Sequence, residues 1–377
     1  MTPKDRMYAV IEGRRPDVWP VAAPYIWLSN ADHWVELTGL PVWKFYEWAN
    51  SADLESHGEM YRVFYEKLPY DYVQSWQTPS LSYRENTEIV IKEGQAYFHY
   101  KKEDRYAKVP SKIHESSSGG GENETRYVYD KKDAREKIKI VKAERRLEEG
   151  LYDYTQKLIQ LYGEERFVVT DGLVNSFYSN VYYVGMTEFY IMLKEEPELI
   201  KYMSELTLEN NIEQIRAAAA VGGDAIYIDD ATATCDMVSP LIYEEFSLPY
   251  LTPLVKEIQR LGKKAILIYF GGIADRVDMI ASTGADVLMM EANMKGYVND
   301  LETVMKKVGD RMCVAGNLNP YDDVEITSDE ELSARMARQL DIARKHGGRF
   351  FSSTGSPLTP GTSVERLRRF IELGHSL

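Results

Sequence analysis

Carboxylate side chains stand at the ends of two apolar runs, a place where charged groups are rare. Asp229 and Asp230 end the run DAIYIDD, and Glu291 ends the run DVLMME. A charge seldom ends a buried strand unless it is paired, caps a turn or takes part in chemistry. Carboxylates gathered in a dry pocket raise the pKa of one another, which suits a general acid. We therefore expect Asp229 and Glu291 to be catalytic, and Asp230 either to cap the next turn or to contact a substrate.

One histidine also stands near the end of an expected strand. His33, in NADHW, is a third catalytic candidate, as an acid or a ligand, and the same position suits a helix-entry residue. The other histidines lie in helical, insertion or terminal sequence. Cys235 and Cys313 have no neighbouring His or Lys, which favours small buried residues over nucleophiles.

Aromatic and amide side chains gather at the ends of the remaining expected strands. Rings of this kind can form a pocket for a flat ligand, with a few polar groups that fix its orientation. The residues that we expect to bind substrate are Tyr25, Trp27, Trp76, Asp171, Asp230, Tyr269, Phe270 and Asn317.

The elements that must position these residues are clearest in the second half of the chain. Apolar β-type runs at 224–229, 264–270, 286–291, 312–317 and 349–354 alternate with helical stretches at 241–261, 273–283, 299–307 and 328–346. The pairs Gly222-Gly223 and Gly347-Gly348 are expected to end helices. Continuous apolar strands that alternate with amphipathic helices indicate a parallel sheet covered on both faces.

Three more runs, at 18–26, 70–76 and 166–172, bring the expected strands to eight. Eight βα units close naturally into a (β/α)8 barrel, whose active site lies at the carboxyl ends of the strands. The alternative, a doubly wound open sheet, usually carries a glycine-rich phosphate loop, and neither GxGxxG nor GxxxxGK[ST] occurs. We predict an α/β protein in which residues 1–377 form a single barrel domain.

Residues 81–129 interrupt this alternation. The alternating runs 88–92 and 96–100 around Glu93-Gly94 predict a β-hairpin, and SSSGGGENE at 116–124 predicts a loop. We interpret the segment as a surface insertion after the second strand.

Composition narrows the function classes. The net charge of −14 disfavours nucleic-acid binding. Two cysteines without a CxxC spacing exclude a disulfide framework, and no apolar run is long enough for a membrane span. The first residues, MTPKDRMYAV, do not resemble a signal peptide, so we expect a cytoplasmic protein.

Four stretches of the second half resemble the uroporphyrinogen decarboxylase superfamily. They are GGDAIYIDDATATCDMVSPLIYEEFSLPYLTPL, GADVLMMEANM, GNLNPYDDV and STGSPLTPGTSVERL, and the third holds the GNxNP signature at 316–320. The resemblance implies the (β/α)8 fold. It also implies one of two chemistries, which are decarboxylation of uroporphyrinogen and methyl transfer to or from a corrinoid.

The resemblance favours the methyl-transfer branch. The decarboxylases carry an RQAGRY-like motif after the first strand, and AAPYIWLSNADHW stands there without arginine. Thiol-methylating relatives bind zinc through HxCG and a later cysteine, and those positions are Ile268, Phe270 and Ser356 here. We therefore expect no zinc of that type, and a metal site rebuilt from Asp229, Glu291 and His33 is the alternative.

What remains resembles the O-demethylase type of corrinoid-dependent methyltransferase. We expect cobalamin on a partner corrinoid protein, because the chain lacks a DxHxxG corrinoid motif. A small methyl donor is the expected substrate, with an aryl methyl ether as one choice and methylamines or methyl thioethers as others. Relatives are often dimers, so a homodimer is one expected assembly.

Two other functions stay open at this stage. A cofactor-independent decarboxylase or other lyase needs at least one cation in the pocket, which Arg84 or Arg105 would have to supply from a loop. A non-catalytic barrel that carries a corrinoid or tetrapyrrole would bind its ligand tightly without turnover.

Overall fold

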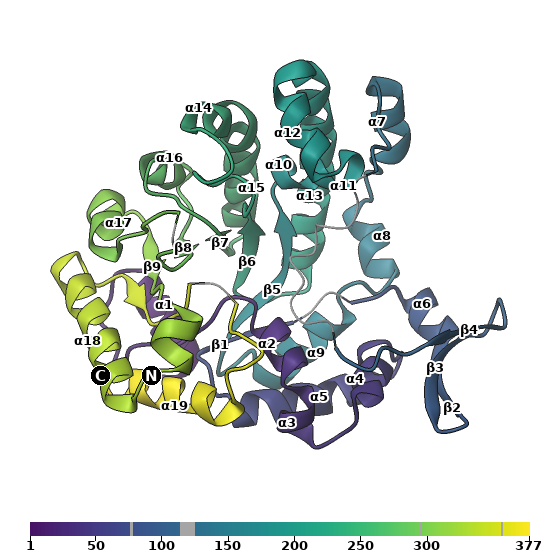
Figure 1. The fold of residues 1–377 in the computed structure, drawn as a ribbon, viewed down its shortest axis with the longest axis horizontal. Helices are drawn as coiled ribbons and strands as arrows, with labels where there is room; N and C mark the ends of the chain where they lie inside the picture. Colours follow the sequence, from purple (N-terminus) through teal and green to yellow (C-terminus); the bar gives the residue numbers. More distant parts are fainter. Residues whose placement is uncertain (76–77, 114–124, 295, 356) are drawn as a thin grey trace.

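The computed structural model describes residues 1–377 except 76–77, 114–124, 295 and 356. Seven strands in this part of the chain form one parallel sheet in the order β1-β5-β6-β7-β8-β9-β10. They are β1 (Tyr72–Gln74), β5 (Phe167–Val174), β6 (Ala225–Asp229), β7 (Lys264–Tyr269), β8 (Val287–Met290), β9 (Cys313–Ala315) and β10 (Phe350–Phe351). Figure 1 shows this sheet curling with its helices arranged around the outside. The predicted α/β barrel fold is confirmed.

The prediction of a strand over 18–26 is wrong except for a short bridging segment around Val21. Val21 pairs in parallel with Ser352, Ala22 N–H donates to the Ser352 carbonyl at 2.9 Å, and Asp71 N–H donates to the Val21 carbonyl at 3.0 Å. Residues 20–22 thus join β10 to β1 and close the ring of strands. Pro20 and Pro24 lack the N–H groups that a longer ladder needs, and helix α2 (Ile26–Asp32) begins soon afterwards.

The helices between the later strands lie where the sequence predicts them. The stretch 241–261 divides into α14 (Pro240–Ile242), a π-helical turn (Tyr243–Ser247) and α15 (Leu248–Arg260). The others are α16 (Val277–Ser282), α17 (Leu301–Val308) and α18 (Asp329–Lys345). Gly222 and Gly223, after α13 (Pro197–Ala220), both have positive φ, and so do Gly347 and Gly348 after α18, as a helix-ending glycine should.

The remaining helices belong to the amino-terminal half, the segments around β5 and the carboxyl terminus. They are α1 (Pro3–Ile11), α3 (Trp34–Thr38), α4 (Val42–Ala49), α5 (Leu54–Lys67), α6 (Leu81–Asn86), α7 (Lys131–Lys137), α8 (Ala143–Glu148), α9 (Asp153–Tyr162), α10 (Ser176–Ser179), α11 (Val181–Val184), α12 (Met186–Glu195), a π-helical segment (Pro320–Glu325) and α19 (Val364–His375). No helix in the described ranges is both long and apolar enough to cross a bilayer.

The insertion forms a small antiparallel sheet at the edge of the molecule (Figure 1). The predicted hairpin is confirmed as β2 (Thr87–Lys92) and β3 (Gln95–Tyr100), with Lys92 opposite Gln95. Glu93 and Gly94 both have positive φ, as a two-residue turn of this kind requires. A third strand, β4 (Arg105–Lys108), was not expected from the sequence. The Ser/Gly segment 116–124 lies outside the described residues.

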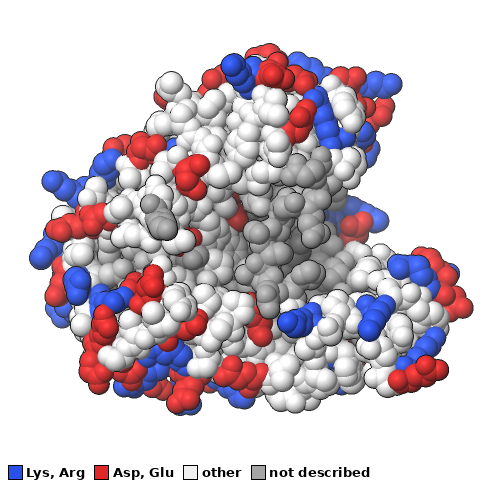
Figure 2. Space-filling model, in the orientation of Figure 1, with Lys and Arg blue, Asp and Glu red and all other residues white. Residues whose placement is uncertain are grey.

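The site-bearing strands are apolar because they are covered on both sides. In β6 every residue before Asp229 is buried, and β8 is buried throughout. The face drawn in Figure 2 is hollowed between the helices around α12 and the hairpin sheet, with acidic and basic side chains both present on its outer surface.

Candidate active site

Asp229 is the last residue of β6 and lies at the carboxyl end of the parallel sheet. Its neighbour in register on β7 is Ile268, and on β5 it is Val174. The main chain reinforces this position, since Asn175 N–H donates to the Asp229 carbonyl at 2.9 Å. The carboxyl group therefore occupies the end of the barrel at which barrel enzymes place their active sites.

The Asp229 carboxyl group is held by two donors on different oxygens. The Tyr25 hydroxyl donates to Oδ2 at 2.5 Å, and the Ala231 N–H donates to Oδ1 at 2.8 Å. Burial raises the pKa of Asp229 to about 6, although both hydrogen bonds lower it, and the neighbouring charge of Asp230 raises it further. The residue as a whole is half-buried, in contrast to the four buried residues of β6 before it.

Aromatic rings surround this carboxyl group. The Tyr25 ring stacks on Phe270 at 4.9 Å between centroids, and its edge contact with Tyr227 measures 5.9 Å. Tyr178 and Tyr182 stack on each other at 5.5 Å, and the charge of Asp229 contributes to the raised pKa of both phenols. The arrangement is an apolar-walled site with one acid and several hydroxyl groups.

Asp230 points into a different, fully buried network. Its carboxylate accepts from Asn175 Nδ2 at 3.0 Å and from Ser247 Oγ at 2.9 Å. The π-helical turn places Ser247 there, and Tyr269 adds a further hydrogen bond and meets the Tyr243 hydroxyl at 2.8 Å. Burial raises the pKa of Asp230 to about 6 against these hydrogen bonds. The network joins the ends of β5, β6 and β7 to the π-helical turn, and Tyr269 is fully buried within it.

Glu291 follows β8, two strands away from β6 in the sheet. It is buried, and its Oε1 accepts the Ala292 N–H at 2.8 Å. Its main-chain carbonyl accepts from Asn299 at 3.1 Å and from Asn317 at 3.2 Å. Asn317 also accepts from Gln339, so its side chain braces the loops around Glu291.

His33 is buried, and both of its ring nitrogens face main-chain carbonyl groups. Nδ1 lies 2.7 Å from the Ser29 oxygen and Nε2 lies 2.5 Å from the Thr362 oxygen. These contacts tie α2 to the loop before α19, and a proton transfer by His33 would have to break one of them.

The structure gives less on three other predicted residues. Trp27 lies in α2 and packs partly buried against the core. Trp76 lies outside the described residues, and the side chain of Asp171 is likewise not described. Asp171 itself lies in β5, where the register with β6 shifts between Thr170 and Leu173.

Several residues of the site were missed from the sequence. Tyr178 and Tyr182 come from the short helices α10 and α11 after β5, and Tyr227 lies within β6 rather than at its end. The signal that could have found the first two is their spacing of four residues, which places both on one side of a helical turn.

Ile268, Phe270 and Ser356 are the residues at which the resemblance would expect zinc ligands of the thiol-methylating type. Ile268 is buried in β7 and Phe270 stacks on Tyr25, whereas Ser356 lies outside the described residues. Among the described residues there is no group of three or more His, Cys, Asp or Glu side chains placed to hold a metal ion.

The arginines that a lyase would need are engaged elsewhere. Arg84 is buried and pairs with Asp153, and Arg105 lies over the Tyr100 ring of the hairpin sheet. Arg276 is buried and donates to the carbonyls of Ala233 and Val238. None of the described groups that shift the pKa of Asp229 is a cation.

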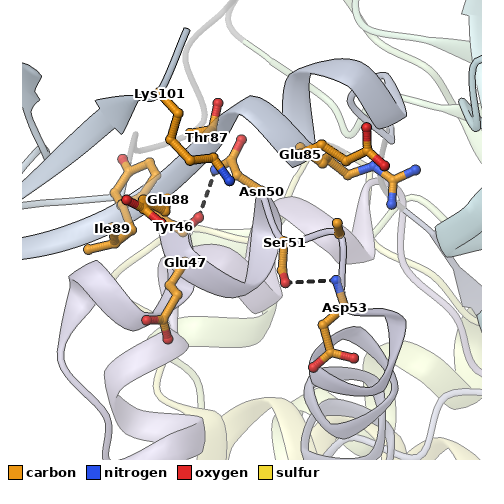
Figure 3. A pocket seen from close by; sticks show the side chains of 12 residues that line it. Tyr46, Glu47, Asn50, Ser51, Asp53, Glu85, Thr87, Glu88, Ile89 and Lys101 are labelled. Atoms are coloured by element: carbon orange, nitrogen blue, oxygen red, sulfur yellow. Dashed lines mark hydrogen bonds between the residues drawn. The ribbon is translucent and has the colours of Figure 1, made fainter. Parts of the chain in front are cut away.

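A separate cavity of about 410 Å³ lies between α4 and the hairpin sheet. Figure 3 shows carboxylates from both sides around it, with the Asn50 amide bonded to the Tyr46 carbonyl and the Asp53 N–H bonded to Ser51. Its lining includes Arg84 but none of the residues that the sequence predicts to be catalytic or to bind substrate.

Fold and geometry together define a barrel that carries a buried-strand carboxyl group, Asp229, at the carboxyl ends of its strands. The family description "Uroporphyrinogen decarboxylase (URO-D)" matches residues 125–377, and the chain belongs to this family. The uroporphyrinogen decarboxylase of Coxiella burnetii (strain RSA 493 / Nine Mile phase I) is 26% identical over 189 residues, 48% of each chain. Uroporphyrinogen decarboxylase 2 of Oryza sativa subsp. japonica is 27% identical over 187 residues, 49% of this chain and 45% of the relative.

The chain thus aligns with about half the length of the curated relatives it matches. Over its whole length the fold is similar to a solved structure, a methyltransferase from Methanosarcina mazei. The TM-score is 0.70 at 16% identity, with 100% of this chain and 99% of that chain covered. That likeness establishes a shared fold.

Proposed function

We propose that this protein is a corrinoid-dependent methyltransferase that demethylates a small methyl donor, with an aryl methyl ether as the first candidate. The observation that carries the proposal is the carboxyl group of Asp229, with its pKa near 6, set among aromatic rings at the barrel end. The fold shared with a methanogen methyltransferase supports it.

The rings of the site suit the donor. Tyr25, Phe270 and Tyr227 give flat apolar surfaces on which an aryl group can stack, and stacked or edge-on contacts of this kind are favourable beyond simple burial. Tyr178 and Tyr182 extend the wall, and Tyr182 is exposed. Rings on both sides of a donor would fix the direction of its methyl group. Such orientation of one reactant toward the other supplies a large part of the rate enhancement in a two-reactant step.

Asp229 supplies the proton that the leaving group needs. When the methyl–oxygen bond breaks, the bond pair remains on the aryl oxygen, and a proton from Asp229 converts that oxygen to a phenol. General acid catalysis of this type contributes about 10²–10⁴-fold. With a pKa of about 6, a fraction of Asp229 is protonated at neutral pH, and the group is still acidic enough to donate its proton.

The corrinoid, carried by a partner protein, supplies the nucleophile that accepts the methyl group. The rim of the barrel suits the approach of such a partner, because exposed apolar side chains follow three strands of the same half of the sheet. They are Met237 and Leu241 after β6, Met294 and Val298 after β8, and Tyr321 after β9.

The test is methyl transfer in solution without oxygen. The protein is mixed with cob(I)alamin and one donor at a time, beginning with guaiacol and veratrole and continuing to methylamines and methyl thioethers. We expect protein-dependent formation of methylated cobalamin with one donor class, and at least tenfold slower formation by Asp229→Asn. Equal rates from the variant would contradict the role of Asp229, and no transfer with any donor would favour decarboxylation.

A further inference from the structure

Tyr25 has a main-chain conformation that tyrosine rarely adopts. Its φ of 49° and ψ of 45° lie in the left-handed region, between Pro24 and the first residue of α2. A side chain with a Cβ atom is disfavoured there, and such residues concentrate where surrounding contacts fix them. Tyr25 is nevertheless buried, so the turn is determined by what its side chain touches.

The side chain is fixed at its face, edge and tip. Phe270 stacks on the face at an interplanar angle of 29°, and Tyr227 meets it nearly perpendicularly at 81°. The hydroxyl group donates to Asp229 Oδ2 at 2.5 Å, which is a short bond to a charged acceptor. These contacts link the segment after the bridging residues to β6 and to the end of β7.

The bond acts on Asp229 in two ways. Together with the Ala231 N–H on Oδ1, it fixes the plane of the carboxyl group. A donated hydrogen bond also stabilises the ionised form, and it lowers the pKa that burial would otherwise raise further.

Other titratable groups among the described residues also interact with Asp229. Asp230 raises its pKa by like charge. The phenols of Tyr178 and Tyr182, from α10 and α11, interact with Asp229 through its charge, and the pKa of each is raised, chiefly by burial. Among the described groups, the Tyr25 hydroxyl is the side chain that lowers the pKa of Asp229.

We infer that Tyr25 is a positioning residue, whose left-handed turn brings its hydroxyl group to Asp229 in order to orient that carboxyl group and ease the release of its proton. This inference goes beyond contact with substrate, and only its kinetic readout rests on the proposed function.

The kinetic test is Tyr25→Phe, which keeps the ring and removes the hydroxyl group. Without the bond, the pKa of Asp229 rises. The pH at which the rate begins to fall should therefore be higher by about one to two pH units. We expect kcat at low pH to fall several-fold through lost orientation, with KM nearly unchanged. A raised KM with an unmoved pH limb would show a substrate contact instead and overturn the inference.

The matched control is Tyr190→Phe. The Tyr190 hydroxyl donates to the Thr232 carbonyl at 3.2 Å and makes no hydrogen bond to Asp229 among those of the described residues. Its loss should leave the pH limb in place. An equal shift from both variants would contradict a specific role for Tyr25.

A second readout needs no substrate. In protein labelled with ¹³C at the aspartate carboxyl carbons, Asp229 is assigned by comparison with Asp229→Asn and titrated in wild type and Tyr25→Phe. An upward shift of the midpoint supports the inference even where no donor is turned over, and an unchanged midpoint overturns it. Should Tyr25→Phe not fold, Phe270→Leu loosens the stack and should shift the same midpoint in the same direction by less, and no shift would overturn it.

Discussion

At the scale of single residues, Asp229 is the centre of the proposed site. Its position at the end of β6 was predictable, because a carboxylate that ends an apolar strand stands out in the sequence. The rings around it were not all predictable. Tyr227 lies inside the strand and the two tyrosines of α10 and α11 follow β5 at a distance, so their meeting depends on how the chain is packed.

The prediction at this scale concerns pH. If Asp229 acts as an acid, the rate depends on its protonated fraction, which falls as pH rises through about 6. Turnover should therefore be roughly constant below pH 5 and fall about tenfold per unit above pH 7. Glu291→Gln serves as the comparison. If the fall in rate above pH 7 disappears in Glu291→Gln but persists in Asp229→Asn, the acid is Glu291 and not Asp229.

At the scale of elements, the second-half strands were predictable because burial on both faces makes them continuously apolar. The first strand was not, since two prolines cut its ladder to the bridge at Val21. β4 was missed because RYAK has no apolar alternation, and it is ordered by pairing with β3.

The irregularity in β5 gives the prediction at this scale. A Cβ atom at Gly172 would lie 2.0 Å from the Tyr227 ring, so Gly172→Ala must displace that ring from the site. We expect a loss of about 1–3 kcal/mol of stability through overpacking, and a several-fold lower rate.

The matched control is Gly296→Ala, where an added methyl group meets open space. Melting temperature and initial rate measure both variants. Unchanged values for Gly172→Ala would show that the Tyr227 ring is not confined in this way.

At the scale of the whole molecule, the end of the barrel opposite the site ties the first and last segments together. Asp71, fully buried before β1, accepts the Val21 N–H at 2.8 Å and faces His375 Nε2 at 2.6 Å. It therefore joins the bridging segment, β1 and α19.

Asp71→Ala would leave the buried Val21 N–H without an acceptor, which costs about 1–3 kcal/mol. We expect His375→Ala to cost less, because its side chain is partly exposed and the Val21 bond survives. Urea denaturation of both variants measures the difference. A larger loss from His375→Ala would contradict the role assigned to the Val21 bond.

The central claim is that the barrel transfers a methyl group and does not remove a carboxyl group. The most direct measurement is a mass balance without oxygen, in which the protein, cob(I)alamin and the preferred methoxyarene are incubated and both methylated cobalamin and free phenol are quantified. The account predicts one phenol for each methyl group transferred, with both products reduced at least tenfold in Asp229→Asn. Release of CO₂ from a carboxylated substrate, with no methyl transfer from any donor, would contradict it.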